Sequence, residues 1–100
     1  MHLTALKIDD RLVLELSESG DFTRLTAHSR IEPEDLDHRL QASRIGTSDG
    51  EHLWIDETQL RTLGPADEVW THEFDAMVAY AAQHGWVVDG RVRIHLSADG

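Results

Sequence analysis

The chain has 100 residues, with 19 acidic and 9 basic side chains and a formal net charge of −10. A chain of this length forms one domain with a modest core, so we expect a single domain over residues 1–100. The absence of cysteine excludes disulfides, thiolate metal sites and cysteine nucleophiles. The negative charge repels phosphate groups, which argues against a general nucleic-acid binder.

The N-terminal segment, residues 1–10, lacks the basic and apolar regions of a secretory signal. No run in the chain approaches the roughly 18 apolar residues that span a membrane. We therefore expect a cytoplasmic protein with no membrane partner.

The first third of the chain predicts a β-hairpin. Residues 11–17 carry leucine at every second position, which is typical of a strand with one apolar face. Asp9 and Asp10 form a short turn that joins this strand to residues 3–8, although Asp-Gly is a stronger turn signal. Residues 22–29 contain threonines in irregular alternation and are interpreted as a third strand.

Residues 33–45 have two interpretations. Pro33 followed by two carboxylates is typical of the first turn of a helix, which would end at Gly46. The alternative is a hairpin that pairs residues 39–45 with residues 51–56. The pattern does not decide between the helix and the strand.

Residues 51–56 are predicted as a strand in both cases, with His52 and Trp54 on its polar side. Asp56 and Gln59 then resemble a capping box. This capping box would open a short helix that ends at Gly64.

The longest predicted helix runs from Pro65 to His84 and ends at Gly85. Its apolar stripe consists of Trp70, Phe74, Met77, Val78 and Ala81. Residues 91–96 follow as a strand with strict alternation of apolar and polar side chains. We therefore predict an α+β fold, in which this helix covers one face of a mostly antiparallel sheet and the other face is wet.

The ionisable clusters give no clear catalytic or metal site. Glu68, His72 and Asp75 share one helix face, but this face points away from the apolar stripe, where pairing within a solvated helix explains them. No zinc-protease, calcium-loop, serine-hydrolase or nucleotide-binding motif occurs. We predict no catalytic residue, metal or cofactor, and the sequence leans against an enzyme without excluding one.

Tyr80, His84 and Trp86 form the first candidate site. Tyr80 and His84 lie one turn apart on the predicted helix, and Trp86 follows just after its end. The three side chains are suited to line a ligand pocket. The alternative is structural, because a histidine near a helix C-terminus also interacts with the last carbonyl groups.

The second candidate site is the polar face of the sheet. Its members are Arg11, Arg91, Arg93, His95 and Trp54. Arginines that gather on one surface of an acidic protein offer a contact for carboxylates, and tryptophan with arginine is typical of protein interfaces. The alternative is that these arginines pair across strands with carboxylates such as Glu15.

These features favour a small acidic accessory or regulatory protein that acts through protein–protein contact, either with another protein or with itself as a homodimer. One alternative is a small-molecule-binding domain or small enzyme, with a pocket for a small acidic ligand near Tyr80, His84 and Trp86. A second alternative is an acidic mimic of nucleic acid, which the net charge alone suggests.

Overall fold

The computed structural model describes residues 1–97, which form one mixed sheet and three helices. In chain order the elements are β1 (His2–Ile8), β2 (Arg11–Ser17), β3 (Thr26–Ser29), α1 (Pro33–Ala42), β4 (Gly46–Ser48), β5 (His52–Asp56), α2 (Glu57–Thr62), α3 (Glu68–Gln83), β6 (Val87–Val88) and β7 (Arg91–Leu96). The strand order is β2-β1-β3-β7-β5-β4, and β6 also pairs with β7. The predicted α+β class is confirmed.

Two strand pairs in the sheet are parallel, namely β1 with β3 and β3 with β7. The remaining pairs are antiparallel, as the alternating sequence pattern predicted. The last strand, β7, is therefore inserted between β3 and β5 rather than added at an edge.

The first hairpin forms as predicted. Asp9 and Asp10 have φ angles of 51° and 64°, and positive values at both turn residues are those of a type I′ turn. Aspartate tolerates this left-handed conformation better than most residues. The turn sets the register in which Ile8 lies opposite Arg11.

Both interpretations of residues 33–45 are partly right. A helix forms over Pro33–Ala42, and a hairpin with β5 also forms, but its first strand is Gly46–Ser48. Gly46 is thus the start of a strand rather than the end of a helix. A Cβ atom at this position would collide with the carbonyl oxygen of Trp54, so the close approach of the two strands requires glycine.

Two predicted element starts are wrong, and one helix starts where predicted, after Asp56, but without its predicted cap. The third strand begins at Thr26 and not at residue 22, because the Phe22 ring instead packs against Trp70 at a centroid distance of 6.0 Å. The predicted capping box is absent, since the Asp56 side chain makes no capping hydrogen bond. The long helix begins at Glu68, because the Asp67 carboxylate accepts a hydrogen bond from Val69 N at 3.3 Å.

One core joins the sheet to all three helices. From the strands it contains the alternating residues Leu3, Ala5, Ala27, Leu53, Ile55, Val92 and Ile94. The predicted helix stripe is also confirmed: Trp70, Phe74, Val78 and Ala81 are buried, and Met77 is half-buried. Leu36 and Leu40 of α1 and Leu60 of α2 are fully buried, so these two helices cover the apolar face of the sheet together with α3.

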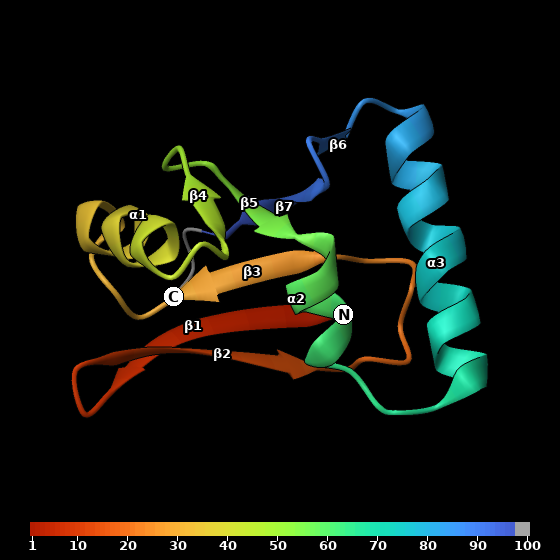
Figure 1. Ribbon diagram of the computed structural model, residues 1–100, viewed down its shortest axis with the longest axis horizontal. Helices are drawn as coiled ribbons and strands as arrows, with labels where there is room; N and C mark the ends of the chain where they lie inside the picture. Colours follow the sequence, from red (N-terminus) through yellow and green to blue (C-terminus); the bar gives the residue numbers. More distant parts are fainter. Residues whose placement is uncertain (98–100) are drawn as a thin grey trace.

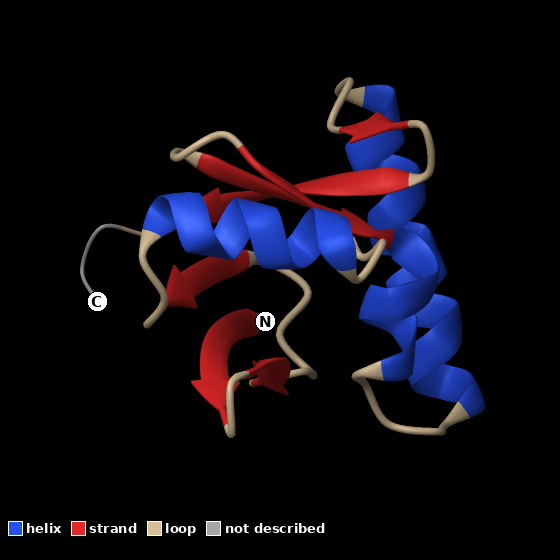
Figure 2. Ribbon diagram, turned by 60° about the vertical axis from the view of Figure 1, so that its left-hand side comes forward, coloured by secondary structure: helices blue, strands red, loops and turns tan. Residues whose placement is uncertain are grey.

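Figure 1 shows how the helices are distributed over the sheet. The helix α3 runs across the end where β1 and β3 begin, and α1 lies toward the other end. In Figure 2 the twist of the sheet is visible, with α1 passing in front of the strands and α3 standing beside them. The position of α3 at one end of the sheet brings its C-terminal turns next to β6 and β7.

Phe74 should be among the most stabilising residues of the core. Its side chain has no exposed surface, and its ring stacks on Trp70 at a centroid distance of 5.1 Å. Phe74→Ala is expected to lower the free energy of unfolding by about 3–5 kcal/mol through the cavity that it leaves. Urea unfolding measures this loss, and Val69→Ala, at a site that is 67 % exposed on the same helix, is the control. Equal midpoints for the two variants would contradict the packing described here.

The ion pair between Asp10 and Arg39 should make stability depend on acid pH. The Arg39 guanidinium, 2.9 Å from Asp10, donates a hydrogen bond that holds the pKa of the Asp10 carboxyl below its ordinary value of 3.8. The contribution is therefore present above that value and is lost as the pH falls through the lower folded pKa. Asp10→Asn should lower the free energy of unfolding at neutral pH. At about pH 2 the variant and the wild type should be equally stable, because the wild type has lost the contribution of the ion pair.

The control is Asp9→Asn in the same turn, because Asp9 forms no ion pair within residues 1–97. The measurement is the free energy of unfolding in urea at both pH values. A penalty for Asp10→Asn that is the same at both would count against this ion pair.

Candidate functional site

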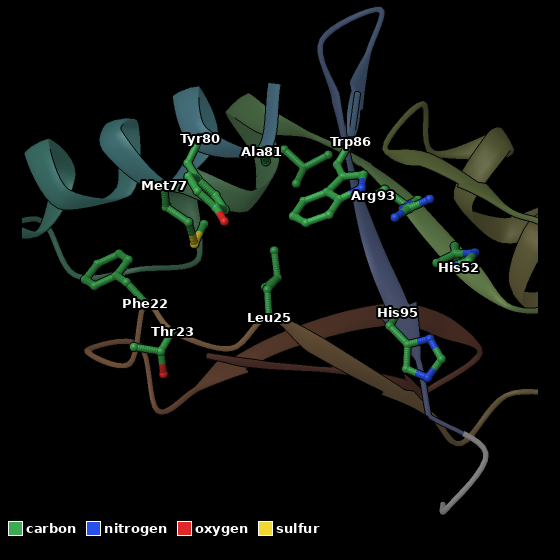
Figure 3. Close-up of a pocket in the computed structure, with 11 residues that line it drawn as sticks. Phe22, Thr23, Leu25, His52, Met77, Tyr80, Ala81, Trp86, Arg93 and His95 are labelled. Carbon is green, nitrogen blue, oxygen red and sulfur yellow. The ribbon is translucent and has the colours of Figure 1, made fainter. Parts of the chain in front are cut away.

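A cleft opens between the end of α3, the loop before β3 and the outer face of β5 and β7. It encloses about 260 Å³. We call it the α3–β7 cleft, and it is lined by Phe22, Thr23, Leu25, His52, Met77, Tyr80, Ala81, Trp86, Val92, Arg93 and His95. Figure 3 shows Leu25 facing Tyr80 and Trp86 across the gap, with His52, Arg93 and His95 along the neighbouring strands.

The cleft exists because two strands share one side of β7 without meeting. β6 pairs with the start of β7, where Val87 lies opposite Val92. β3 pairs with its end, where Thr26 lies opposite His95. Between these pairs, Arg93 N donates a hydrogen bond to the Trp86 carbonyl oxygen at 2.8 Å, and the register of neither β3 nor β6 includes Arg93 or Ile94. The opening reaches down to Val92 in the core.

The lower wall of the cleft is a loop, residues 18–25, that is fixed at both ends. The Trp70 indole donates a hydrogen bond to the Ser19 carbonyl oxygen at 2.7 Å. The amino group of Met1 donates to the carbonyl oxygens of Asp21 and Arg24 at 2.7 and 2.9 Å. These contacts hold Phe22 and Leu25 at the rim of the cleft.

The upper wall is a row of stacked rings at the end of α3. Gly85 has a φ angle of 77° and turns the chain back, so that Trp86 N donates to the Ala81 carbonyl oxygen at 2.9 Å. The His84 ring lies 4.4 Å from Tyr80 and 4.7 Å from Trp86, measured between centroids. The Arg93 guanidinium carbon lies 5.5 Å from the Trp86 ring centroid, within the range of a cation–π contact.

The polar wall consists of side chains on the outer face of β5 and β7. His52 and His95 lie opposite each other in the strand register, with ring centroids 5.8 Å apart. Asp49 lies behind His52, with 3.9 Å between the carboxylate and Nδ1. The backbone N–H groups of Glu51 and His52 donate to this carboxylate and lower the pKa of Asp49. Asp49 itself is not among the residues that line the cleft.

The fold brings together four of the residues selected from the sequence: Tyr80, Trp86, Arg93 and His95 line the α3–β7 cleft. His84 does not line it, but it stacks behind Trp86 and joins Tyr80 to the same row. The three aromatic residues therefore meet as the sequence suggested, while their role in binding stays a prediction.

The expected arginine surface is divided. Arg91 and Trp54 line a separate shallow hollow with Thr47, Asp56, Val88 and Asp89. Arg11 lies on the edge strand β2, separated from β7 by β1 and β3. β1 and β7 run in the same direction, because both are parallel to β3. Arg11 lies beside the end of β1 and Arg91 at the start of β7, so the two arginines lie at opposite ends of the sheet. The expectation that Arg11 joins Arg91 and Arg93 in one patch is therefore wrong.

The arginines on this face are not neutralised by the carboxylates of their own sheet. Within residues 1–97, Arg11, Arg91 and Arg93 form no ion pair, although Asp56 is the strand neighbour of Arg91. The alternative of cross-strand pairing with Glu15 is thus not observed, since Glu15 lies opposite Thr4.

Sequence reasoning missed Phe22, Leu25 and His52 as members of the cleft. Phe22 and Leu25 were assigned to a strand, and their loop is positioned by contacts with Trp70 and Met1 that no local pattern encodes. His52 was placed correctly on the polar side of its strand. Only its pairing with His95 across the sheet makes it part of the site.

The acidic face of α3 is engaged in a structural contact. Asp75 pairs with Arg61 of α2, and Arg61 also pairs with Glu57 at 2.8 Å. Among residues 1–97 we find no group of three or more histidine or carboxylate side chains arranged to hold a metal ion. In the same range, no helix is both long enough and apolar enough to cross a membrane.

No family model, no curated protein and no solved structure matches this chain. The function is therefore argued from the geometry of the two surface hollows and the charges around them.

Proposed function

We propose that this protein binds a small organic anion, with a flat apolar body and a carboxylate group, in the α3–β7 cleft. The proposal takes up the small-molecule alternative of the sequence analysis. The observation that carries it is the Arg93 guanidinium, which forms no ion pair within residues 1–97 and lies beside a cleft with aromatic and apolar walls.

The apolar walls fit the body of such a ligand. Phe22 and Leu25 offer aromatic and aliphatic surface on one side, and Met77 lies with the Tyr80 and Trp86 rings on the other. Flat ligands gain both burial and ring stacking in such a setting. A volume of about 260 Å³ lies at the small end of ligand pockets, which favours a ligand with a single ring or a short chain.

The polar wall fits the carboxylate. Arg93, His52 and His95 are the ionisable side chains of the lining apart from Tyr80, and no aspartate or glutamate among residues 1–97 lines the cleft. In a protein with a formal net charge of −10, this is a local site where an anion is not repelled by the walls. A guanidinium binds a carboxylate through two parallel hydrogen bonds, which gives it an advantage over a point charge.

The proposal is for binding rather than catalysis. The one hydroxyl of the lining besides Tyr80, that of Thr23, donates a hydrogen bond to Asp21 in its own loop. The two histidines have no nucleophile placed against them in the cleft. We also propose a cytoplasmic location, which the sequence led us to expect.

Phenylacetate and its neutral amide, phenylacetamide, test the proposal as a matched pair of probes. We expect phenylacetate to shift the amide NMR signals of residues around the cleft, and phenylacetamide to bind about tenfold more weakly, because it lacks the charge. Arg93→Gln should weaken phenylacetate binding by a similar factor. Arg91→Gln, on the same strand and outside the cleft, should leave it unchanged.

Thermal melts followed by circular dichroism show whether the Arg93 variant keeps its fold. Equal affinity for the two probes, or equal loss in the Arg91 and Arg93 variants, would refute an anion site built on Arg93.

Protein contact at the neighbouring hollow is the second candidate function. It is favoured by the placement of Trp54 and Arg91 together with Val88, which is 50 % exposed. Trp and Arg are among the residue types that contribute most to protein interfaces. An acidic partner suits the Arg91 guanidinium, which forms no ion pair within residues 1–97. The nucleic-acid mimic stays a weaker prediction, since it rests on the net charge alone.

Trp54→Ala tests this second function. It should remove a specific protein that is captured from a lysate of the source cells by the wild-type chain, because the indole would be the anchor of the interface. Arg93→Gln should still capture that protein, which separates the hollow from the cleft. Identical captured proteins for the wild type and Trp54→Ala, compared by mass spectrometry, would contradict the contact.

A further inference from the structure

The strand β2 forms an unprotected edge of the sheet. It has 7 residues, and within residues 1–97 its hydrogen-bonded neighbour is β1 alone. The other edge, β4, has only 3 residues, and the Asp37 side chain of α1 accepts a hydrogen bond from Ser48 N at 2.8 Å. Proteins commonly shorten or cover edge strands, because a free edge pairs readily with another strand. Only one of the two edges is protected in this way.

The hairpin geometry determines which backbone groups of β2 are free. A two-residue turn closes on a hydrogen-bonded pair, here Ile8 and Arg11, and such pairs alternate along an antiparallel ladder. The backbone N–H and C=O groups at positions 11, 13, 15 and 17 therefore face β1. Those of Leu12, Leu14 and Leu16 face away from the sheet and are available to a further strand.

The side chains of β2 are all leucine on the core face, whereas the outer face carries Val13 together with Arg11, Glu15 and Ser17. Leu12, Leu14 and Leu16 are half-buried on the core face, and Val13 is half-buried on the outer face opposite Leu6. Arg11 and Glu15 are exposed on the outer face, two residues to either side of Val13. The charges are thus placed symmetrically about Val13 and have opposite signs.

We propose that β2 is the contact surface of a homodimer, in which β2 of one copy pairs antiparallel with β2 of a second copy about a two-fold axis at Val13. In this register Arg11 of each copy lies opposite Glu15 of the other, so that two identical ion pairs flank the axis. Leu12 lies opposite Leu14 of the second copy. Both have outward-facing backbone groups, which satisfies the hydrogen-bond pattern.

The same register also builds an apolar row across the new interface. Leu6 and Val13 are cross-strand neighbours on the outer face, and the axis places Val13 next to Val13 of the second copy. A row of four apolar side chains then crosses the joint, from Leu6 of one copy to Leu6 of the other. A register centred on Leu14 would place Val13 opposite Glu15 and Arg11 opposite Ser17, so charge complementarity selects the axis at Val13.

The interface is independent of the proposed anion site. It lies at the far edge of the sheet from the strands β5 and β7 that carry His52, Arg93 and His95. It differs from the contact that the sequence suggested on the polar face of the sheet, where Arg11 was grouped with Arg91, Arg93, His95 and Trp54. It gives Arg11 an ionic partner that residues 1–97 of its own chain do not supply.

Charge reversal tests the register. Sedimentation velocity over a concentration series should show a dimer for the wild type. Arg11→Glu and Glu15→Arg should each raise the dissociation constant at least about tenfold, because each change creates two like-charge contacts. The double variant R11E/E15R restores opposite charges and should dimerise again. An equal mixture of the two single variants should form a heterodimer, detected by native mass spectrometry.

The control is Arg91→Glu, which changes the net charge by the same amount on the outer face of β7 and should leave the dimer intact. Val13→Lys places two cations at the axis. It should dissociate the dimer although the charges at positions 11 and 15 are unchanged. Circular-dichroism melts confirm that each variant is folded.

Three results would overturn the proposal. They are a wild type that is monomeric at all concentrations reached, single charge reversals that dimerise like the wild type, and dissociation by Arg91→Glu. The register at Val13 would also be wrong if Val13→Lys disrupted the dimer but the mixture of Arg11→Glu and Glu15→Arg formed no heterodimer.

Discussion

The insertion of β7 between β3 and β5 is the constraint on which the rest of the structure depends. This strand comes from the last residues described, yet it hydrogen-bonds with β3, β5 and β6. Its inward residues Val92 and Ile94 are fully buried beside the side chains of α3. The sheet therefore cannot close until β7 is present, and pairing between strands so far apart in sequence is entropically costly to begin.

The α3–β7 cleft is a direct consequence of this arrangement. β3 and β6 approach β7 from different parts of the chain and pair with different halves of it, which leaves a gap above Val92. The tight turn at Gly85 then places Trp86 on one side of the gap, and the loop tied to Trp70 closes the other. Aromatic walls next to the Arg93 guanidinium thus arise where three separate segments meet.

The two edges of the sheet are treated differently by the fold. At β4, the helix α1 packs alongside and its Asp37 satisfies a backbone N–H group. At β2, Arg39 of α1 binds the turn through Asp10, and β1 is the one strand among residues 1–97 that pairs with β2. The separation of Arg11 from Arg91 also follows from this layout, because the hairpin that carries Arg11 extends away from β7. As a result, Arg11, Arg91 and Arg93 lie in three different surroundings, namely the edge strand, the hollow with Trp54 and the α3–β7 cleft, rather than in one patch.

The elements whose signals lie within one segment were predictable from the amino-acid sequence. The leucines of β2, the alternation in β7 and the apolar stripe of α3 each repeat with the period of their own structure, and Gly85 ends α3 by adopting a conformation that other residues resist. These patterns were sufficient for the α+β class and for the contact among Tyr80, His84 and Trp86, which are close in the chain. The parallel pairing of β1, β3 and β7, the position of the loop with Phe22 and Leu25, and the meeting of His52 with His95 were decided only by the tertiary structure. Local periodicity fixes which face of a strand is buried, whereas the choice of its neighbour depends on how the whole chain buries its apolar surface at once.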